Sequence, residues 1–390
     1  MTEQLKKSPR IEVVDALRGF AVMAILLVHN LEHFIFSVYP TDPAPWLAAL
    51  DKAVFDTTFF LFAGKAYAIF ALLFGFTFYI QSYNQSLKGK DFGYRFLWRL
   101  LLLAGFATIN AAFFPAGDVL LLFSIVGVVL FITRKWSDRW VGVLAVFFLL
   151  QPIEIYHIIA LQINPAYQLP DLHVGQMYAE VAEVTKSGDF LSFILCNIGL
   201  GQKASFLWAV GAGRLMQTAG LFLTGYLIAR KHLFVDEGTH LSMWEKLLII
   251  SAILFVPLYI LAGRFAGSAD EALSQVAVIL DMWQKLAFTF VLISAFVLVY
   301  YLTPLRSHSA PLRRYGKMSL TNYLSQSVIG AFIYFPIGLY LAPYCGYTLS
   351  LLIGVAIFAV QLAFSRMWLK HHRLGPLELI WHKLTWIGSK

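Results

Sequence analysis

Long apolar segments recur from one end of this chain to the other, and they constrain its fold more than any other feature. A helix that crosses a bilayer needs about 20 mostly apolar residues at a rise of about 1.5 Å each. About ten segments meet this requirement, at 13–34, 60–82, 93–114, 117–133, 140–160, 205–229, 244–263, 272–303, 318–341 and 347–369. Only 13% of the residues are charged, roughly half the share found in soluble domains. The sequence therefore predicts an all-α, polytopic integral membrane helix bundle.

The positions of lysine and arginine predict how the bundle is oriented. Loops that remain in the cytoplasm keep an excess of these residues. They gather in alternate connections, beginning before the first segment and ending after the last: Lys6, Lys7, Arg10, Lys88, Lys90, Arg95, Arg99, Arg134, Lys135, Arg139, Arg230, Lys231, Arg306, Arg313, Arg314, Lys317, Lys370 and Arg373. The opposite connections are acidic or contain proline. An even number of spans, with both termini in the cytoplasm, preserves this alternation.

Other features narrow the classes of protein and partner. No polar stretch is long enough to fold alone, so we expect residues 1–390 to form a single transmembrane domain. The net charge of +8 does not indicate nucleic-acid binding, because the basic residues form short clusters between apolar segments. Cys196 and Cys345 lie far apart and imply neither a disulfide framework nor a thiolate metal site. No phosphate-binding loop is present, which disfavours ATP-driven transport.

Two histidines stand near the outer end of the first apolar segment. His29 and His33 are four residues apart, so a continuous helix would present them on one face. A neutral imidazole there could take a proton from an attacking hydroxyl or amine. Solvated histidines at a helix end are an equal alternative. A metal shared with Glu32 would need a further converging ligand, so we predict no metal site.

Further polar residues stand at depths where they require a partner or water, because an ionisable group there costs about 2.5–3.5 kcal/mol. Asp118 could hold an acceptor or orient an imidazole, or simply cap a helix. Lys65 could attract an anionic group, or snorkel to the interface. Arg214, three residues before Gln217, needs a carboxylate, a phosphate or backbone carbonyls.

On the cytoplasmic side, Arg18 follows Asp15 by three residues, which allows either an anchor at the interface or a group that faces an opening. Asn322 and Gln326 lie one turn apart in the ninth segment. Such side chains either line a pathway or bond helices together. We take Arg18, Asn322 and Gln326, with Lys65, Arg214 and Gln217, as candidate substrate-binding residues.

Several motifs, in their order along the chain, resemble those of a known family. They are VDALRGF at 14–20, FALLFG at 70–75, GDVL at 117–120, TAG at 218–220, GKMSLTNYLSQ at 316–326 and GPLE with a following Trp at 375–381. The motifs at 316–326 and 375–381 are the most specific. Over nearly its whole length the chain resembles the YeiB-like family, whose members contain domain of unknown function 418. It departs from the family at His29, where asparagine is frequent.

The family is similar to a wider group of transmembrane acyltransferases that includes heparan-α-glucosaminide N-acetyltransferase and bacterial polysaccharide O-acyltransferases. The resemblance implies transfer from cytosolic acyl-CoA, such as acetyl-CoA, to an acceptor hydroxyl or amine at the outer face. A histidine would serve there as base or transient acyl carrier. We expect His29 or His33 as the base and Asp118 as its partner. Lys65 or Arg214 would bind an anionic group, and Arg18 would face the cytoplasm.

The same resemblance implies a multi-pass protein of the bacterial plasma (inner) membrane. Its expected partners are membrane lipids and a small-molecule, glycan or lipid acceptor, with homodimerisation left open. A transporter or channel for a small solute or lipid is the alternative, because buried polar groups line pathways as readily as catalytic sites. Under the acyltransferase hypothesis, His29, Lys65 and Asp118 should approach one cavity.

Overall fold

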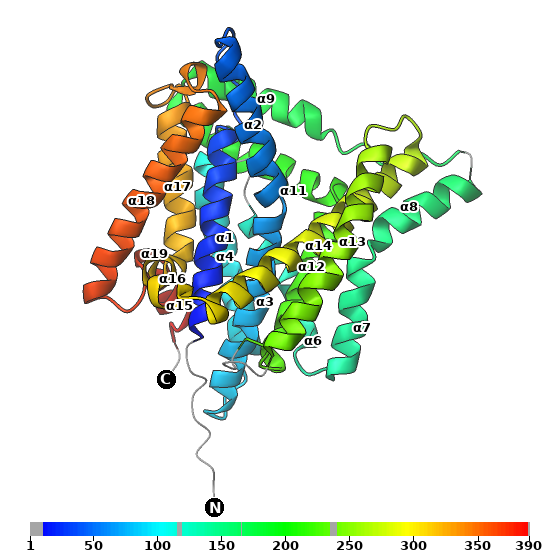
Figure 1. The fold of residues 1–390 in the computed structure, drawn as a ribbon, viewed down its shortest axis with the longest axis vertical. Coiled ribbons are helices and arrows are strands. Elements are labelled where there is room, and N and C mark those ends of the chain that lie inside the picture. The colour runs from blue at the N-terminus through cyan, green and yellow to red at the C-terminus, as the bar shows by residue number, and fades with distance from the viewer. Residues whose placement is uncertain (1–10, 115–118, 165, 235–239, 389–390) are drawn as a thin grey trace, which may run out of the picture.

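The computed structural model describes residues 11–114, 119–164, 166–234 and 240–388, and the regular structure in these ranges is helical (Figure 1). The helices are α1 (Glu12–Leu31), α2 (Pro45–Phe62), α3 (Lys65–Ser86), α4 (Gly93–Phe113), α5 (Leu120–Val126), α6 (Val128–Thr133), α7 (Asp138–Leu149), α8 (Pro152–Ile163), α9 (Val174–Ser187), α10 (Phe190–Cys196), α11 (Gln202–Gly211), α12 (Arg214–Arg230), α13 (Leu241–Phe265), α14 (Glu271–Leu302), α15 (Leu305–His308), α16 (Ala310–Lys317), α17 (Ser319–Tyr334), α18 (Tyr347–His371) and α19 (Pro376–Thr385). A π-helix, Asn197–Gly201, joins α10 to α11, and a short 3-10 turn, Ala342–Tyr344, precedes α18.

Six segments in the described part of the chain are long and apolar enough to cross a membrane. They are Pro45–Ser86, Gly93–Phe113, Phe190–Gly211, Leu241–Phe265, Glu271–Leu302 and Tyr347–His371. The pair α7 and α8, bent by 52°, makes a seventh if it counts as one span. This supports a polytopic helical membrane protein with six or seven candidate spans, fewer than the roughly ten predicted.

Helix breaks explain much of the difference in span number. The described part of the predicted segment 117–133 is a short apolar helical stretch, Leu120–Thr133, that is not long enough for a span. The segment 140–160 is divided at Gln151, whose φ is 62°. The segment 205–229 is two helices, separated at Gly213 with a φ of 69°. Helix α17 has only 16 residues. Each apolar run is helical, but hydropathy alone does not show where a helix stops within it.

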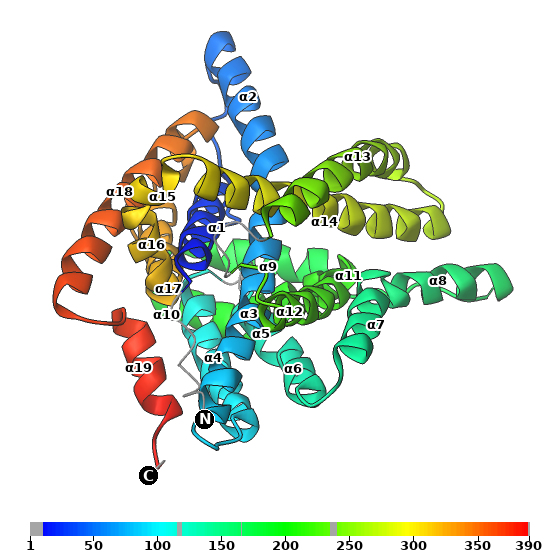
Figure 2. The same ribbon diagram turned by 60° about the horizontal axis from the view of Figure 1, so that its bottom comes forward.

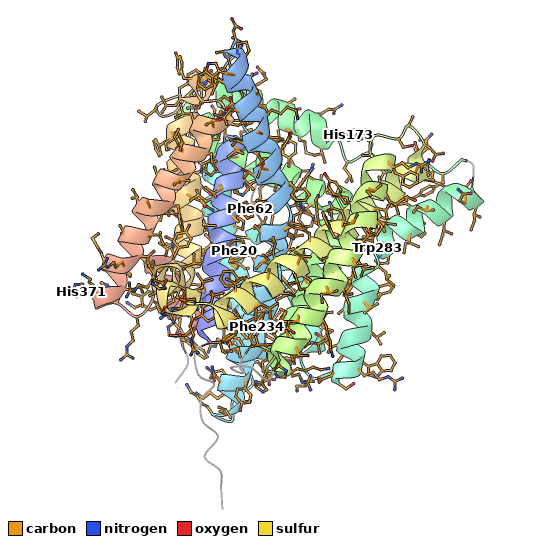
Figure 3. All side chains as sticks on the ribbon, viewed as in Figure 1. Phe20, Phe62, His173, Phe234, Trp283 and His371 are labelled. Atoms are coloured by element: carbon orange, nitrogen blue, oxygen red, sulfur yellow. The ribbon has the colours of Figure 1, made fainter. Side chains whose placement is uncertain are left out.

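Helices α1, α3, α4 and α17 stand near the middle of the bundle. Helix α18 lies on one side of them, and the pair α13 and α14 lies on the other (Figures 1 and 2). Helix α3 packs along α12 and α1, and α1 also contacts α16 and α18. Helices α13 and α14 form a long hairpin on one side, while α9 lies across one end of the bundle. Aromatic side chains join the elements, as where Phe20 of α1 meets Phe62 of α2 edge to face, with ring centroids 5.9 Å apart (Figure 3).

Two helical glycines allow α3 and α12 to approach each other closely. A Cβ on Gly75 would lie 1.9 Å from the carbonyl oxygen of Phe222, and one on Gly225 would lie 1.8 Å from that of Leu72. Neither distance leaves room for a methyl group. Small residues at such a contact let the two backbones touch, which is how helices gain packing energy in lipid.

Contacts between distant segments bring the two ends of the described chain together. Glu12, at the start of α1, forms an ion pair with Arg313 of α16. Helix α19 packs against α4, where the Arg95 and Trp98 side chains donate hydrogen bonds to backbone carbonyls of residues 384–387. Glu378 of α19 also accepts hydrogen bonds at the start of α17. Both ends of the described chain therefore lie on one side of the bundle. The even number of spans and the cytoplasmic side stay predictions.

Candidate functional site

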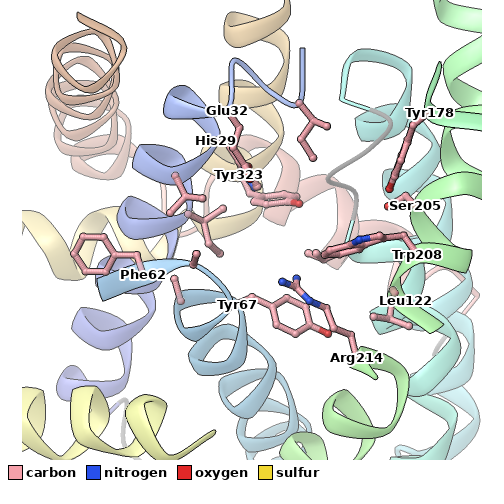
Figure 4. A pocket seen from close by; sticks show the side chains of 18 of the residues that line it. His29, Glu32, Phe62, Tyr67, Leu122, Tyr178, Ser205, Trp208, Arg214 and Tyr323 are labelled. Carbon is pink, nitrogen blue, oxygen red and sulfur yellow. The ribbon is translucent and has the colours of Figure 1, made fainter. Parts of the chain in front are cut away.

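One cavity in the bundle, which we name the histidine cavity, has a volume of about 360 Å³ (Figure 4). It lies where α1, α3, α5, α11 and α12 converge. Its walls come from Ile25, Val28, His29, Glu32, Ile35, Ser37, Tyr39, Phe62, Ala63, Gly64, Ala66, Tyr67, Val119, Leu122, Tyr178, Ser205, Trp208, Ala209, Arg214 and Tyr323. Most of these side chains are apolar or aromatic, and, apart from tyrosine hydroxyls, the ionisable side chains among them are His29, Glu32 and Arg214.

His29 and Glu32 form an acid–histidine pair in this wall. The Nδ1 atom of His29 lies 3.3 Å from Oε2 of Glu32, in the last turn of α1. The imidazole also meets the edge of the Phe114 ring, with centroids 4.6 Å apart. No hydrogen bond to Nε2 is present among the described residues. A carboxylate on one nitrogen fixes the orientation of the ring and leaves the other nitrogen to accept a proton.

Arg214 enters the same cavity from the first turn of α12. Its guanidinium carbon lies 4.9 Å from the centroid of Tyr67 and 4.5 Å from that of Trp208. The left-handed turn at Gly213 sets the direction in which α12 begins. Figure 4 shows the guanidinium between the two rings, pointing into the cavity. Within the described part of the chain it forms no hydrogen bond or ion pair.

A second cavity, which we name the cationic cavity, has a volume of about 260 Å³. Its lining residues are Arg18, Phe70, Leu73, Phe74, Thr77, Phe78, Gln81, Phe96, Arg99, Leu103, Leu120, Phe123, Lys317, Ser319, Leu320, Tyr323, Leu374, Glu378, Trp381 and His382. It holds three cationic groups around aromatic walls. It lies at the end of the bundle where the basic loops predict the cytoplasm.

The charged groups of the cationic cavity are held in place by neighbouring side chains. Arg18 donates hydrogen bonds to Asp15, at 3.2 Å, and to Thr77, at 2.9 Å. The guanidinium of Arg99 lies 3.5 Å from the centroid of Trp381. The net excess of positive charge suits an anionic ligand.

Glu378 is the acid of the cationic cavity, and it is engaged in capping α17. Its carboxylate accepts bonds from the backbone N–H groups of Leu320 and Thr321 and from the Thr321 hydroxyl. Burial raises the pKa of Glu378 above its ordinary value, and the hydrogen bonds from Thr321 and Leu320 oppose that rise. The single charge of Glu378 acts on Arg99 and offsets only part of the charge of the three cationic groups in this wall.

Tyr323 belongs to the walls of both cavities. It is 1% exposed and stands in the second turn of α17. Helix α5 also contributes to both, because Leu122 lines the histidine cavity while Leu120 and Phe123 line the cationic cavity. The two cavities therefore lie back to back, with Tyr323 at the boundary.

Three of the predicted site residues line these cavities. His29 and Arg214 lie in the histidine cavity, and Arg18 lines the cationic cavity. That this cavity opens to the cytoplasm stays a prediction. Asp118 lies outside the described residues, so its predicted place beside His29 stays a prediction. Val119, the next residue along the chain, is part of the histidine cavity wall.

His33 and Lys65 lie outside both cavities. His33 is fully buried, with Nε2 2.7 Å from the Ser350 hydroxyl and Nδ1 2.8 Å from the carbonyl oxygen of Val38. Its ring stacks on Tyr334. The ammonium group of Lys65 turns away from the histidine cavity and donates to the carbonyl oxygen of Phe60 at 2.8 Å. The expectation that Lys65 shares a cavity with His29 is thus wrong.

The remaining predicted substrate-binding residues lie between helices. Gln217 donates to the carbonyl oxygen of Met282, which joins α12 to α14. Asn322 donates to the carbonyl oxygen of Tyr315 and to the Ser365 hydroxyl. Gln326 is fully buried, and its amide has no hydrogen-bond partner in the described ranges. None of the three lines the histidine or the cationic cavity.

Several residues of the two cavities were not predicted as site residues. Arg99 and Lys317 were assigned only to the basic loops, and Trp208 and Tyr323 have ordinary aromatic identities in apolar runs. The sequence signals nothing about which way these aromatic rings point. Among the described residues, no three His, Cys, Asp or Glu side chains are grouped so that they could hold a metal ion.

Comparisons with known proteins place the chain among uncharacterized bacterial relatives. It is 24% identical to "Uncharacterized protein YxaH" of Bacillus subtilis (strain 168), over 97% of this chain and 95% of YxaH. It is 27% identical to "Uncharacterized 39.9 kDa protein in amylase 3'region" of Bacillus acidopullulyticus, over 97% and 94% of the two chains. It is 24% identical to "Uncharacterized protein YeiB" of Escherichia coli (strain K12), over 95% of each.

No solved structure matches this chain. The family model that matches is described as "Protein of unknown function (DUF418)". Residues 228–388 of the chain thus match the DUF418 family, and the chain is homologous over nearly its full length to YxaH and YeiB.

Proposed function

We propose that this protein is a transmembrane acyltransferase, which takes an acyl group from cytosolic acyl-CoA and transfers it to a hydroxyl or amine acceptor at the outer face. The observation that carries the proposal is the pair of cavities that share Tyr323. One contains an acid–histidine pair, and the other contains three cations. This division suits a donor and an acceptor that enter from opposite sides.

The cationic cavity is the donor site in this proposal. Coenzyme A carries several phosphate charges, and guanidinium groups such as those of Arg18 and Arg99 bind phosphate oxygens in a bidentate manner. Phe70, Phe74 and Phe123 supply apolar walls for the acyl chain and its linker. The thioester would then lie toward Tyr323, at the boundary with the histidine cavity.

The histidine cavity is the acceptor site, with His29 as the general base. Nε2 of His29 takes the proton from the acceptor hydroxyl or amine as its oxygen or nitrogen attacks the thioester carbonyl. The carboxylate of Glu32 stabilises the imidazolium that forms. The carbon–sulfur bond then breaks, and the departing thiolate takes up the proton. The products are the acylated acceptor and free coenzyme A.

The test is turnover by the purified protein in nanodiscs that contain total bacterial lipid, supplied with radiolabelled acetyl-CoA. Label transfer to lipid or added glycan, and free coenzyme A, are both measured. General base catalysis contributes about 10²–10⁴-fold, so His29→Ala should lower the rate by at least about 100-fold, and Glu32→Gln should lower it less. His157→Ala is the matched control, because the side chain of His157 has a hydrogen bond to Tyr167 as its one such partner among the described residues, and it lines neither cavity.

The proposal fails if acyl-CoA donors from acetyl to palmitoyl give no turnover, or if His29→Ala retains the wild-type rate. A second candidate, a lipid or solute transporter, rests on the same two cavities facing each other across Tyr323. It predicts that the protein speeds movement of a fluorescent phospholipid across proteoliposomes without any acyl-CoA. Dithionite quenching of the outer leaflet measures that movement directly.

A further inference from the structure

Arg214 presents a positive charge to the histidine cavity, and its guanidinium has no ion-pair or hydrogen-bond partner among the described residues. We propose that its guanidinium binds the oxyanion of an amphiphilic ligand, one that carries a phosphate or carboxylate on an apolar body. That this ligand is the acyl acceptor rests on the acyltransferase proposal. That it binds at Arg214 does not. The sequence pointed only to a need for some partner at this depth.

The immediate surroundings of Arg214 leave its charge available. Tyr67 and Trp208 cover the faces of the guanidinium, as cation–π partners do, and leave its N–H edge directed into the cavity (Figure 4). Among the described lining residues the carboxylate is that of Glu32, and it already lies against His29. A guanidinium in a largely apolar setting needs an anion or several carbonyls, and a bidentate oxyanion matches its fork of donors.

Two helix ends add to the positive potential at this wall. Helices α3 and α12 both begin here, each after a glycine in the left-handed region, Gly64 and Gly213. The first N–H groups of a helix have no partner within the helix and carry a partial positive charge. Gly64, Ala66 and Tyr67 of the α3 start line the cavity beside Arg214. The fixed charges of the wall therefore favour an anion.

The rest of the cavity selects an apolar body for this anion. Ile25, Val28, Phe62 and Leu122 line it without hydrogen-bonding groups. A small hydrophilic anion would leave these apolar walls in contact with water. An amphiphile would cover them, and its binding would be favoured by about 25 cal/mol of free energy per Å² of apolar surface buried. His29 lies in the same cavity and would face the ligand beyond its anionic group.

The experiment measures binding without turnover, by thermal unfolding of the protein in dodecyl maltoside. Three probes separate the parts of the ligand: dioctanoyl phosphatidylglycerol, dioctanoylglycerol with the same chains but no phosphate, and glycerol 1-phosphate with no chains. We expect the complete amphiphile to raise the Tm of the wild type. The effect on Arg214→Gln should require at least tenfold more probe, and Arg214→Lys should be intermediate.

Arg264→Gln is the matched control, because Arg264 stands at the end of α13 and lines neither cavity. It should bind like the wild type. If glycerol 1-phosphate alone matches the amphiphile, a free phosphate is the ligand and the apolar body is wrong. Equal binding of dioctanoylglycerol, or an unchanged response of both Arg214 variants, overturns the proposal. Binding that depends on Arg214 without acyl transfer would instead reject only the acyltransferase function.

Discussion

At the scale of single residues, the two histidines of α1 have different environments because the helix ends between them. The four-residue spacing of His29 and His33 predicted one shared face, which requires the helix to continue. Helix α1 stops at Leu31, and His33, Phe34 and Ile35 all have positive φ values, of 47°, 55° and 62°. That turn carries His33 away from the cavity and against Ser350 and Tyr334.

We therefore expect substitution of His33 to affect stability rather than binding. His33→Ala leaves the Ser350 hydroxyl and the Val38 carbonyl without this partner, which should lower the free energy of unfolding by about 1–3 kcal/mol. His33→Asn should lose less, because asparagine tolerates a positive φ. Thermal unfolding in detergent measures the loss, and phosphatidylglycerol affinity should stay at the wild-type value. An unchanged Tm for His33→Ala would contradict this assignment.

At the scale of helices, apolar length predicted where most elements lie, whereas their breaks depended on single residues. Gly213 and Gln151 interrupt runs that hydropathy reads as continuous. A glycine in such a run is compatible with either an unbroken helix or a turn, and the choice depends on tertiary packing. The break at Gly213 is what brings Arg214 to a helix start in the cavity wall. This part of the site could not be predicted from spacing.

The contact between α3 and α12 gives a prediction at the same scale. Gly75→Ala would place a methyl group against the Phe222 backbone, so the helices must separate. We expect a loss of about 1–3 kcal/mol, as for other overpacked cores. Gly105→Ala in α4 is the control, because no atom lies within 4 Å of its added Cβ, and alanine favours helix by about 1 kcal/mol. Detergent unfolding should rank the variants accordingly; equal stability would show that the helices do not pack as described.

For the whole molecule, the charge pattern predicted two sides, and the structure contains two cavities that share one wall residue. Arg18, Arg99 and Lys317 come from three distant segments and meet at one end. The alternation of basic loops predicted that these three residues lie on the same side of the membrane. It did not predict that they line one cavity. That depends on how α4 and α17 pack with α19, which hydropathy does not report. The shared wall at Tyr323 is likewise visible only in three dimensions.

If the cavities belong to opposite sides of the membrane, single cysteines in them should be labelled from opposite sides. Cys196 and Cys345 are first replaced, and Ser37→Cys in the histidine cavity and Gln81→Cys in the cationic cavity are made separately. A membrane-impermeant maleimide should label Ser37→Cys in spheroplasts and Gln81→Cys only in inside-out vesicles. This follows because the connections that contain proline, here Pro40–Pro45, were predicted to lie opposite the basic loops, and the basic loop after α3 was predicted to be cytoplasmic. Labelling of both from one side would place the two cavities on that side, and a donor and an acceptor could then not approach from opposite faces.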